Sequence, residues 1–331
     1  MEDEKSTSTS LATIPTTASI KSSSISSSVS SQELQRLLVK HKNYADFDFR
    51  YVNIGFIGAG HITEKIVNSI LMRTKIEAYR IHISANTDEK NEKFTRLGCT
   101  FTTSNDELFS RHKCDVIFLC FHGNVMKTVK RKFTKEPIDH TNYPKCVLSL
   151  VVGVSLRKIK RLFPEHEHLE KPIAFYRLVL NSSVVYGTGI CTIDVNPDSK
   201  FLTQSLKSLL QKFTRDIENV PEQCADYVCC LSSAGLAMTY MFMQSLVNAA
   251  EKLGMDKHLA LKLVSHLLLN SAKSILITGK SIDVLQHESY RNSSPTEIGL
   301  LHLDRYEVQE KIVEAMKTSY ERSMQLSFKE N

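Results

Sequence analysis

The pattern of apolar and polar residues divides the chain into a serine-rich start, an alternating middle and a helical end. Between residues 51 and 152, short apolar runs alternate with stretches of helical spacing. The apolar runs cover residues 51–57, 80–84, 114–120 and 145–152, and the helical stretches include residues 61–71 and a charged segment that ends near Gly98. Apolar strands separated by helices are typical of a parallel sheet covered on both faces. The middle of the chain is therefore predicted to be a doubly wound α/β domain.

Long helical periodicity replaces this alternation after about residue 222. The predicted helices cover residues 222–253, 256–279 and 304–327. Gly254 and Gly279 follow the first two, at the place where glycine commonly ends a helix. We therefore expect an all-helical second domain.

The start of the chain has a different composition. The first 31 residues contain 17 serines and threonines and no aromatic residue, so they are expected to be disordered. Ser31 followed by Glu33 and then by spaced leucines predicts a short capped helix. The predicted organisation is a tail (1–31), a lead-in helix (32–50), a nucleotide-binding domain (51–221) and a helical domain (222–327).

Composition and charge are those of a soluble globular protein. The chain has 331 residues, enough for about two domains. Its net charge of +6 is spread along the sequence, which argues against a nucleic-acid partner. The N-terminus shows neither a secretory signal nor an Arg-rich presequence, so a cytoplasmic location is expected.

Residues 227–250 form an uncharged stretch of 24 residues, long enough to span a bilayer. Polar residues such as Gln244 and Asn248 interrupt it, and no basic cluster flanks it. A helix buried in a domain or dimer core is favoured over a membrane span, and no membrane partner is expected. Such a helix is about 36 Å long, which is hard to cover within one small domain. We therefore expect a homodimer or a higher homo-oligomer.

Eight cysteines are present, but no Cys-x-x-Cys pair occurs. The spacings suit neither a zinc site nor a disulfide scaffold, so we expect reduced thiols and no metal.

A glycine-rich turn joins the first predicted strand to the first predicted helix. The pair is Gly58-x-Gly60. In such a pair the first glycine permits a tight turn, and the second lets the backbone approach a pyrophosphate at the helix N-terminus. Thr63 occupies the third position of the motif. The turn predicts dinucleotide binding by a Rossmann domain; the alternative is a tightly packed turn that binds nothing. The candidate cofactor residues in this turn are Gly55, Gly58, Gly60, His61 and Ile62.

The end of the second strand selects between cofactors. An acid at this position would hold the ribose of NAD, but Asp88 comes late for that role. Asn86 and Thr87 can donate to phosphate oxygens, and Lys and Arg residues follow. NADP is therefore favoured over NAD. Asn105 and His122 are further cofactor candidates.

Six segments, in this order, resemble motifs of the pyrroline-5-carboxylate reductase family. They are Ile54–Gly60, Asp115–Cys120, Ser149–Leu156, Arg177–Asn181, Ala250–Met255 and Ala260–Val264, and the resemblance extends over about residues 51–327. It implies a Rossmann domain, a helical domain that exchanges surface with a second subunit, and NAD(P)H-dependent reduction of a cyclic imine.

The chain departs from this family where substrate should bind. The family's Ser-Pro-Gly-Gly-x-Thr is here Ser294-Pro-Thr-Glu297, and its Ser-Gly-Ser-Gly-Pro-Ala is Ser232-Ser-Ala-Gly-Leu-Ala237. Loss of the double glycine removes a cradle of backbone amides that an anionic substrate would need. We therefore expect a small imine or carbonyl substrate and doubt true proline biosynthesis.

Hydride transfer needs an oriented substrate and a proton source. The candidate catalytic residues are Ser232, Thr296, Glu297 and Asn181. Glu297 is a proton donor if burial raises its pKa; otherwise it is a solvated residue at the start of a helix. For Ser232 and Thr296 the alternative interpretation is that their hydroxyls cap a helix or a turn. Two hypotheses remain: an NADP-dependent oxidoreductase, and a catalytically silent dimeric scaffold.

Overall fold

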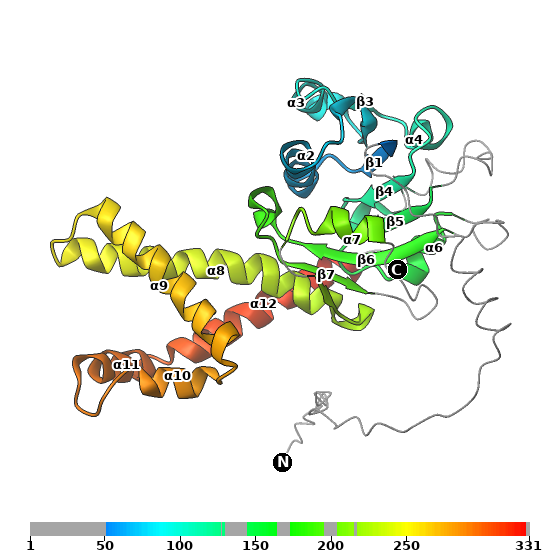
Figure 1. Cartoon of the computed structure of the whole chain (residues 1–331). Helices are drawn as coiled ribbons and strands as arrows, with labels where there is room; N and C mark the ends of the chain where they lie inside the picture. The colour runs from blue at the N-terminus through cyan, green and yellow to red at the C-terminus, as the bar shows by residue number, and fades with distance from the viewer. Residues whose placement is uncertain are drawn as a thin grey trace, which may run out of the picture. The chain divides into compact units, whose positions relative to one another are not determined.

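The structure is a computed structural model that describes residues 51–126, 128–129, 144–163, 173–194, 204–214 and 217–328 (Figure 1). The predicted disordered tail (1–31) and lead-in helix (32–50) lie outside the described residues.

The described strands form one sheet in the order β3-β2-β1-β4-β5-β6-β7-β8. They are β1 (Ile54–Ile57), β2 (Ile81–Ser84), β3 (Thr100–Thr102), β4 (Val116–Leu119), β5 (Cys146–Ser149), β6 (Ala174–Leu180), β7 (Cys191–Asp194) and β8 (Ile217–Asn219). Neighbours from β3 to β6 are parallel, which confirms the predicted parallel sheet. β7 runs antiparallel to β6 because their connection is too short for a crossover helix.

Helices cover both faces of the sheet, as the alternation predicted (Figure 1). The helices of this region are α2 (His61–Arg73), α3 (Asn91–Thr95), α4 (Glu107–Ser110), α6 (Leu156–Lys160) and α7 (Gln204–Leu210), with the short 3-10 turns η2 (Ala78–Arg80), η3 (Asp88–Lys90), η4 (Gly123–Val125) and η7 (Ser182–Tyr186). One hydrophobic core contains buried residues of α2, α3 and α7, and a second core contains those of α4 and α6. The sheet separates two layers of helices, as in a doubly wound fold.

The helical region begins with the turn η9 (Glu222–Cys224). Its helices are α8 (Ala225–Lys252), α9 (Lys257–Thr278), α10 (Ile282–Glu288), α11 (Pro295–Arg305) and α12 (Val308–Phe328). The three predicted helices are present, and Gly279 ends α9 in the left-handed conformation that was expected. The predicted start at residue 304 was wrong because Glu307, with φ of 51°, separates α11 from α12.

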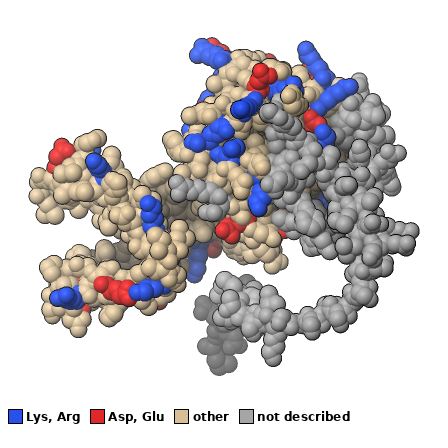
Figure 2. Space-filling view, viewed as in Figure 1, with Lys and Arg blue, Asp and Glu red and all other residues tan. Residues whose placement is uncertain are grey.

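Many apolar side chains of the helical region are exposed in the single chain. On α8 and α9 they include Leu231, Tyr240, Met241, Phe242, Leu261, Leu267 and Leu269. Much of this region carries neither acidic nor basic side chains in Figure 2. Two segments, Glu222–Lys252 and Lys257–Thr278, are long and apolar enough to cross a membrane by length and composition. The local core around Val247, Ala260 and Val264 is small, so most of the apolar surface of these helices needs another partner.

Candidate functional site

The predicted cofactor residues gather at one edge of the sheet. Strands β1, β2 and β4 are parallel neighbours, so their carboxyl ends meet at the same edge. Gly58 follows β1, Asn86 follows β2 and His122 follows β4. The order of connections reverses between β1 and β4, where ligands of doubly wound sheets bind.

Gly58 has a conformation and a setting that other residues do not accept. Its φ is +109°, and a Cβ atom there would stand 2.3 Å from the backbone oxygen of Cys120. Its N–H donates to the carbonyl of Ser84 at 2.8 Å, and Cys120 N–H donates to the carbonyl of Ile57 at 2.8 Å. The glycine therefore permits close packing between the ends of β1, β2 and β4.

The N-terminus of α2 follows directly. Gly60 is the N-cap and contributes no side-chain hydrogen bond, and His61 and Ile62 are the first helical residues. The hydroxyl of buried Thr63 donates to the carbonyl of Gly58 at 2.6 Å. The third residue of the motif therefore links the first turn of α2 to the glycine turn. The first backbone amides of the helix carry partial positive charge. They and the turn with Gly58 and Gly60 fit the pyrophosphate of a dinucleotide.

The predicted cofactor residues that follow β2 and β3 lie in two different environments. Asn86 and Thr87 are exposed after β2. Asn105 is buried, and its side-chain oxygen accepts a hydrogen bond from the Ser84 hydroxyl at 2.6 Å. Of the three cations downstream, Lys93 pairs with Glu64 and Arg96 pairs with Glu92. Lys90 forms no ion pair with a residue in the described part of the chain.

His122 is exposed at the N-cap of η4, and its backbone carbonyl accepts a hydrogen bond from Val125 N–H at 3.0 Å. The nearby Cys120 is unsuited to thiolate chemistry, because burial raises the pKa of its thiol to about 12. All eight cysteines are free in this structure, and six of them are buried.

Asn181 and Ser232, two predicted catalytic residues, are brought together. Asn181 Nδ2 donates to the backbone carbonyl of Ser232 at 3.2 Å, and its Oδ1 accepts from Ile190 N–H at 3.1 Å. The Ser232 hydroxyl donates to the carbonyl of Cys229 at 3.2 Å. Both residues are buried. Their polar groups therefore connect the end of β6 to α8.

A buried ion pair strengthens this connection, and the candidate catalytic residues chosen from the sequence did not include it. Arg177 on β6 is 3% exposed and donates through Nη2 to Asp226 Oδ1 at 2.6 Å. The same carboxylate oxygen accepts from Gly153 N–H at 2.8 Å, and Arg177 Nη1 donates to the carbonyl of Val154. Arg177 stood in the Arg-x-x-x-Asn motif, but only the structure shows its partner. The loop after β5 is thereby fixed to the first turn of α8.

Thr296 and Glu297 lie apart from this pair. Both are in the first turn of α11, where Thr296 is exposed. The Ser294 hydroxyl accepts from Glu297 N–H at 3.2 Å, and the Glu297 carboxylate accepts from Ser293 N–H. These reciprocal bonds resemble a capping box, so the carboxylate serves the helix start. Within the described residues, no hydrogen bond links this turn to the Asn181–Ser232 pair.

Comparison with known proteins divides the chain in the same way as its secondary structure does. Residues 53–153 match the family model for NADP oxidoreductase, coenzyme F420-dependent, and residues 222–326 match the model for pyrroline-5-carboxylate reductase dimerisation. The first match covers the glycine turn, and the second covers α8 to α12.

Individual proteins are similar over most of their length. Pyrroline-5-carboxylate reductase 3 of Xenopus laevis is 26% identical, over 83% of this chain and 96% of that protein. Pyrroline-5-carboxylate reductase 2 of Bacillus subtilis is also 26% identical, over 82% and 94%. The crystal structure of Plasmodium falciparum pyrroline carboxylate reductase with NADP bound has a TM-score of 0.66 at 18% identity, covering 85% of this chain and 100% of that one. Two family matches, relatives along nearly their whole length and a shared fold lead to one assignment: the chain is a divergent member of the pyrroline-5-carboxylate reductase family.

Proposed function

We propose that the protein is an NADP-dependent oxidoreductase that reduces a C=N or C=O bond of a small substrate. The observation that carries the proposal is the turn at Gly58, which leads through the N-cap Gly60 into the N-terminus of α2. His61, Ile62 and the glycines supply backbone to the pyrophosphate, and a bound nicotinamide would supply hydride.

The preference for NADP over NAD is supported by the loop after β2. Asn86 and Thr87 are exposed there, where they can donate to a 2′-phosphate. Lys90 is exposed in η3, which follows this loop, and adds positive charge. No carboxylate stands directly at the end of β2 to hold a ribose hydroxyl or to repel phosphate.

The proposed substrate is an imine or carbonyl compound without the carboxylate of pyrroline-5-carboxylate. The turn Ser294–Glu297 begins a capped helix, and its acidic side chain would repel a substrate carboxylate. Asn181, Ser232, Thr296 and Glu297 remain the proposed substrate-side residues. We propose that a homodimer completes the site, since no hydrogen bond within the described residues joins the Asn181–Ser232 pair to the turn of α11, and the region 222–326 matches a dimerisation family.

The cofactor proposal is tested by titrating the full chain with NADPH and NADH in a calorimeter. Saturable NADPH binding, tighter than NADH binding, is expected. Gly58→Ala should weaken binding at least about tenfold, because the new Cβ meets the carbonyl of Cys120. Gly299→Ala is the matched control, since a Cβ there meets nothing within 4 Å. A folded wild-type protein that binds neither nucleotide refutes the proposal.

A catalytically silent dimeric scaffold is the second candidate, and specific contacts favour it. The Ser232 hydroxyl, both side-chain groups of Asn181 and the Glu297 carboxylate all serve protein hydrogen bonds. Oxidation of NADPH in the presence of a panel of neutral cyclic imines and small ketones separates the two. Turnover that is lost in Gly58→Ala excludes the scaffold. Cofactor binding and dimerisation without turnover favour it.

A further inference from the structure

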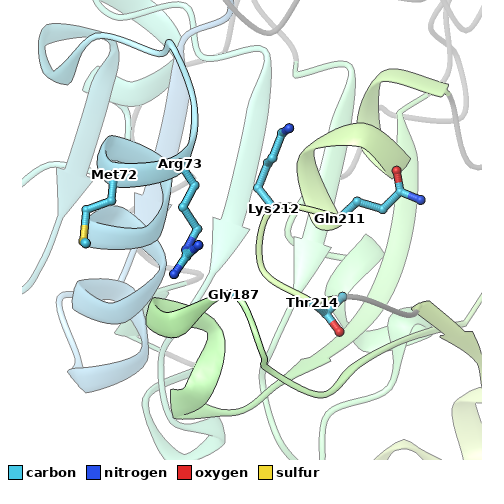
Figure 3. Close-up of a pocket in the computed structure, with 6 residues that line it drawn as sticks. All are labelled: Met72, Arg73, Gly187, Gln211, Lys212 and Thr214. Atoms are coloured by element: carbon cyan, nitrogen blue, oxygen red, sulfur yellow. The ribbon is translucent and has the colours of Figure 1, made fainter.

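A cavity of about 520 Å³ opens at the end of α2 that is remote from the glycine turn. Its walls are Met72, Arg73, Gly187, Gln211, Lys212 and Thr214 (Figure 3). Helix α2 has 13 residues, so its two ends lie about 18 Å apart. The cavity is therefore separate from the proposed pyrophosphate-binding turn.

The walls of the cavity are held by the packed domain. Ile70 of α2, Val184 of η7 and Phe213 after α7 are fully buried in one hydrophobic core. The hydroxyl of Ser69 donates to the carbonyl of Val184 at 2.9 Å, and Gly189 N–H donates to the carbonyl of Phe213 at 3.0 Å. The elements that carry the lining residues are therefore fixed relative to one another.

Arg73 is oriented by contacts that leave donors for a ligand. Its Nη2 donates to the carbonyl of Val185 at 3.2 Å. A Cβ at Gly187, whose φ is +71°, would stand 2.8 Å from the Arg73 guanidinium, so the glycine lets this group lie against the backbone. At the end of α2 the carbonyl of Ile70 accepts hydrogen bonds from both the N–H and the hydroxyl of Thr74, so this carbonyl does not need the guanidinium. Since a guanidinium has five N–H donors, others remain available.

The lining is cationic and polar. Lys212 supplies a second positive charge from the turn after α7, and Gln211 and Thr214 add an amide and a hydroxyl. Among the residues that the structure describes, no acidic side chain lines the cavity, and neither Arg73 nor Lys212 forms an ion pair. Figure 2 shows several Lys and Arg side chains close together on the surface around α2. Met72, which is 72% exposed, gives the cavity one apolar wall.

We propose that this cavity binds a small organic anion whose carboxylate or phosphate contacts Arg73, while Lys212, whose side chain points away from Arg73 (Figure 3), adds positive charge to the same surface. A guanidinium held in one orientation suits the planar oxygens of such groups, and the lysine adds a point charge. The volume lies within the range of small-molecule pockets, about 300–1,000 Å³, which exceeds the needs of a bare inorganic ion.

The test is calorimetric titration of the full-length protein with glycerol 3-phosphate, malonate and inorganic phosphate at constant ionic strength. Saturable binding of glycerol 3-phosphate or malonate is expected, and the tighter of the two identifies the preferred anionic group. Arg73→Met should weaken that binding at least about tenfold, and Lys212→Met about threefold or more. Lys207→Met, which removes an exposed lysine of α7 outside the cavity, should leave it unchanged.

Three results would overturn the proposal. They are the absence of saturable binding of both organic probes to the wild type, equal weakening by Arg73→Met and Lys207→Met, and equal affinity for inorganic phosphate and the best organic probe. All substituted side chains are exposed, so the variants should keep the wild-type melting temperature without ligand. NADPH binding should be unchanged in Arg73→Met, which separates this site from the proposed function.

Discussion

Two stacked histidines should make the α/β domain sensitive to acid. His82 on β2 is 6% exposed, and its ring lies parallel to that of His112, with centroids 4.1 Å apart. Nδ1 of His82 and Nε2 of His112 are buried and have no hydrogen-bond partner within the described residues. Burial, and secondarily the charge of His112, lower the pKa of His82 from 6.5 to about 4. The folded protein therefore favours the neutral ring.

The sign of the effect follows from the two protonation states. In the unfolded chain His82 takes up a proton near pH 6.5, whereas in the folded chain it does so only near pH 4. Stability is thus fully present above about pH 7 and is lost as the pH falls from 6.5 towards 4. The loss from His82 alone is about 1.4 kcal/mol at pH 5.5 and about 2.5 kcal/mol at pH 4.5.

His112 acts in the same direction and does not cancel the effect. Burial, and secondarily Arg111, lower the pKa of His112, while Glu107 raises it. Protonation of either ring would also place a positive charge against the other. The decline attributed to His82 is therefore a lower bound for the pair.

The assay is urea unfolding at pH 7.5, 5.5 and 4.5 and at one protomer concentration, since oligomers change apparent stability with concentration. His82→Phe keeps an aromatic ring but cannot titrate, so its unfolding free energy should fall less with acid than that of the wild type, by about 2.5 kcal/mol at pH 4.5. His258→Phe is the control, because His258 is exposed on α9. Parallel pH profiles of wild type and His82→Phe would refute the reasoning.

Two further substitutions test the contacts that hold the helical region. Asp226→Asn removes the charge that faces buried Arg177 and should lower the free energy of unfolding, measured in urea, by about 3 kcal/mol. Asp283→Asn, in exposed α10, is the control and should change this free energy little. Equal effects of the two substitutions would contradict a structural role of the ion pair. Ser294→Ala removes the side-chain cap of α11 and should lower the melting temperature, by an amount equivalent to about 1 kcal/mol. Ser281→Ala is its control, since Ser281 begins α10 without a side-chain cap bond, and an equal loss there would contradict the assignment.

The sequence pattern predicted most strands of the region around the glycine turn and fewer elements in the rest of the chain. The strands around Gly58 were found because apolar residues dominate the runs of β1 and β4 and alternate with polar ones in β2. Strand β6 was not found, although all seven of its residues are buried, because Arg177 interrupts its apolar run. Helices α10 and α11 were not predicted because they are short and lie between polar turns. Local apolar periodicity is a weak signal for such elements.

The candidate substrate residues illustrate a second limit. Ser232 and Asn181 were chosen from motif positions, and the structure shows that they meet. Glu297 was chosen as a proton donor or a helix-start residue, and its carboxylate caps α11. Motif positions therefore identified these residues as candidates, whereas their hydrogen-bond partners could be seen only in the structure.

The sequence by itself determined the features that depend on neighbours along the chain. The turn at Gly58 needs a positive φ, and the buried strands and long helices need a fixed periodicity; both are properties of a few successive residues. The tertiary structure alone decided the pairings of Arg177 with Asp226 and of Asn181 with Ser232, which are 49 and 51 residues apart. It also decided the cavity between α2, η7 and α7. A buried charge or amide takes whichever partner packing brings within hydrogen-bond distance, and that choice has no periodic trace in the sequence.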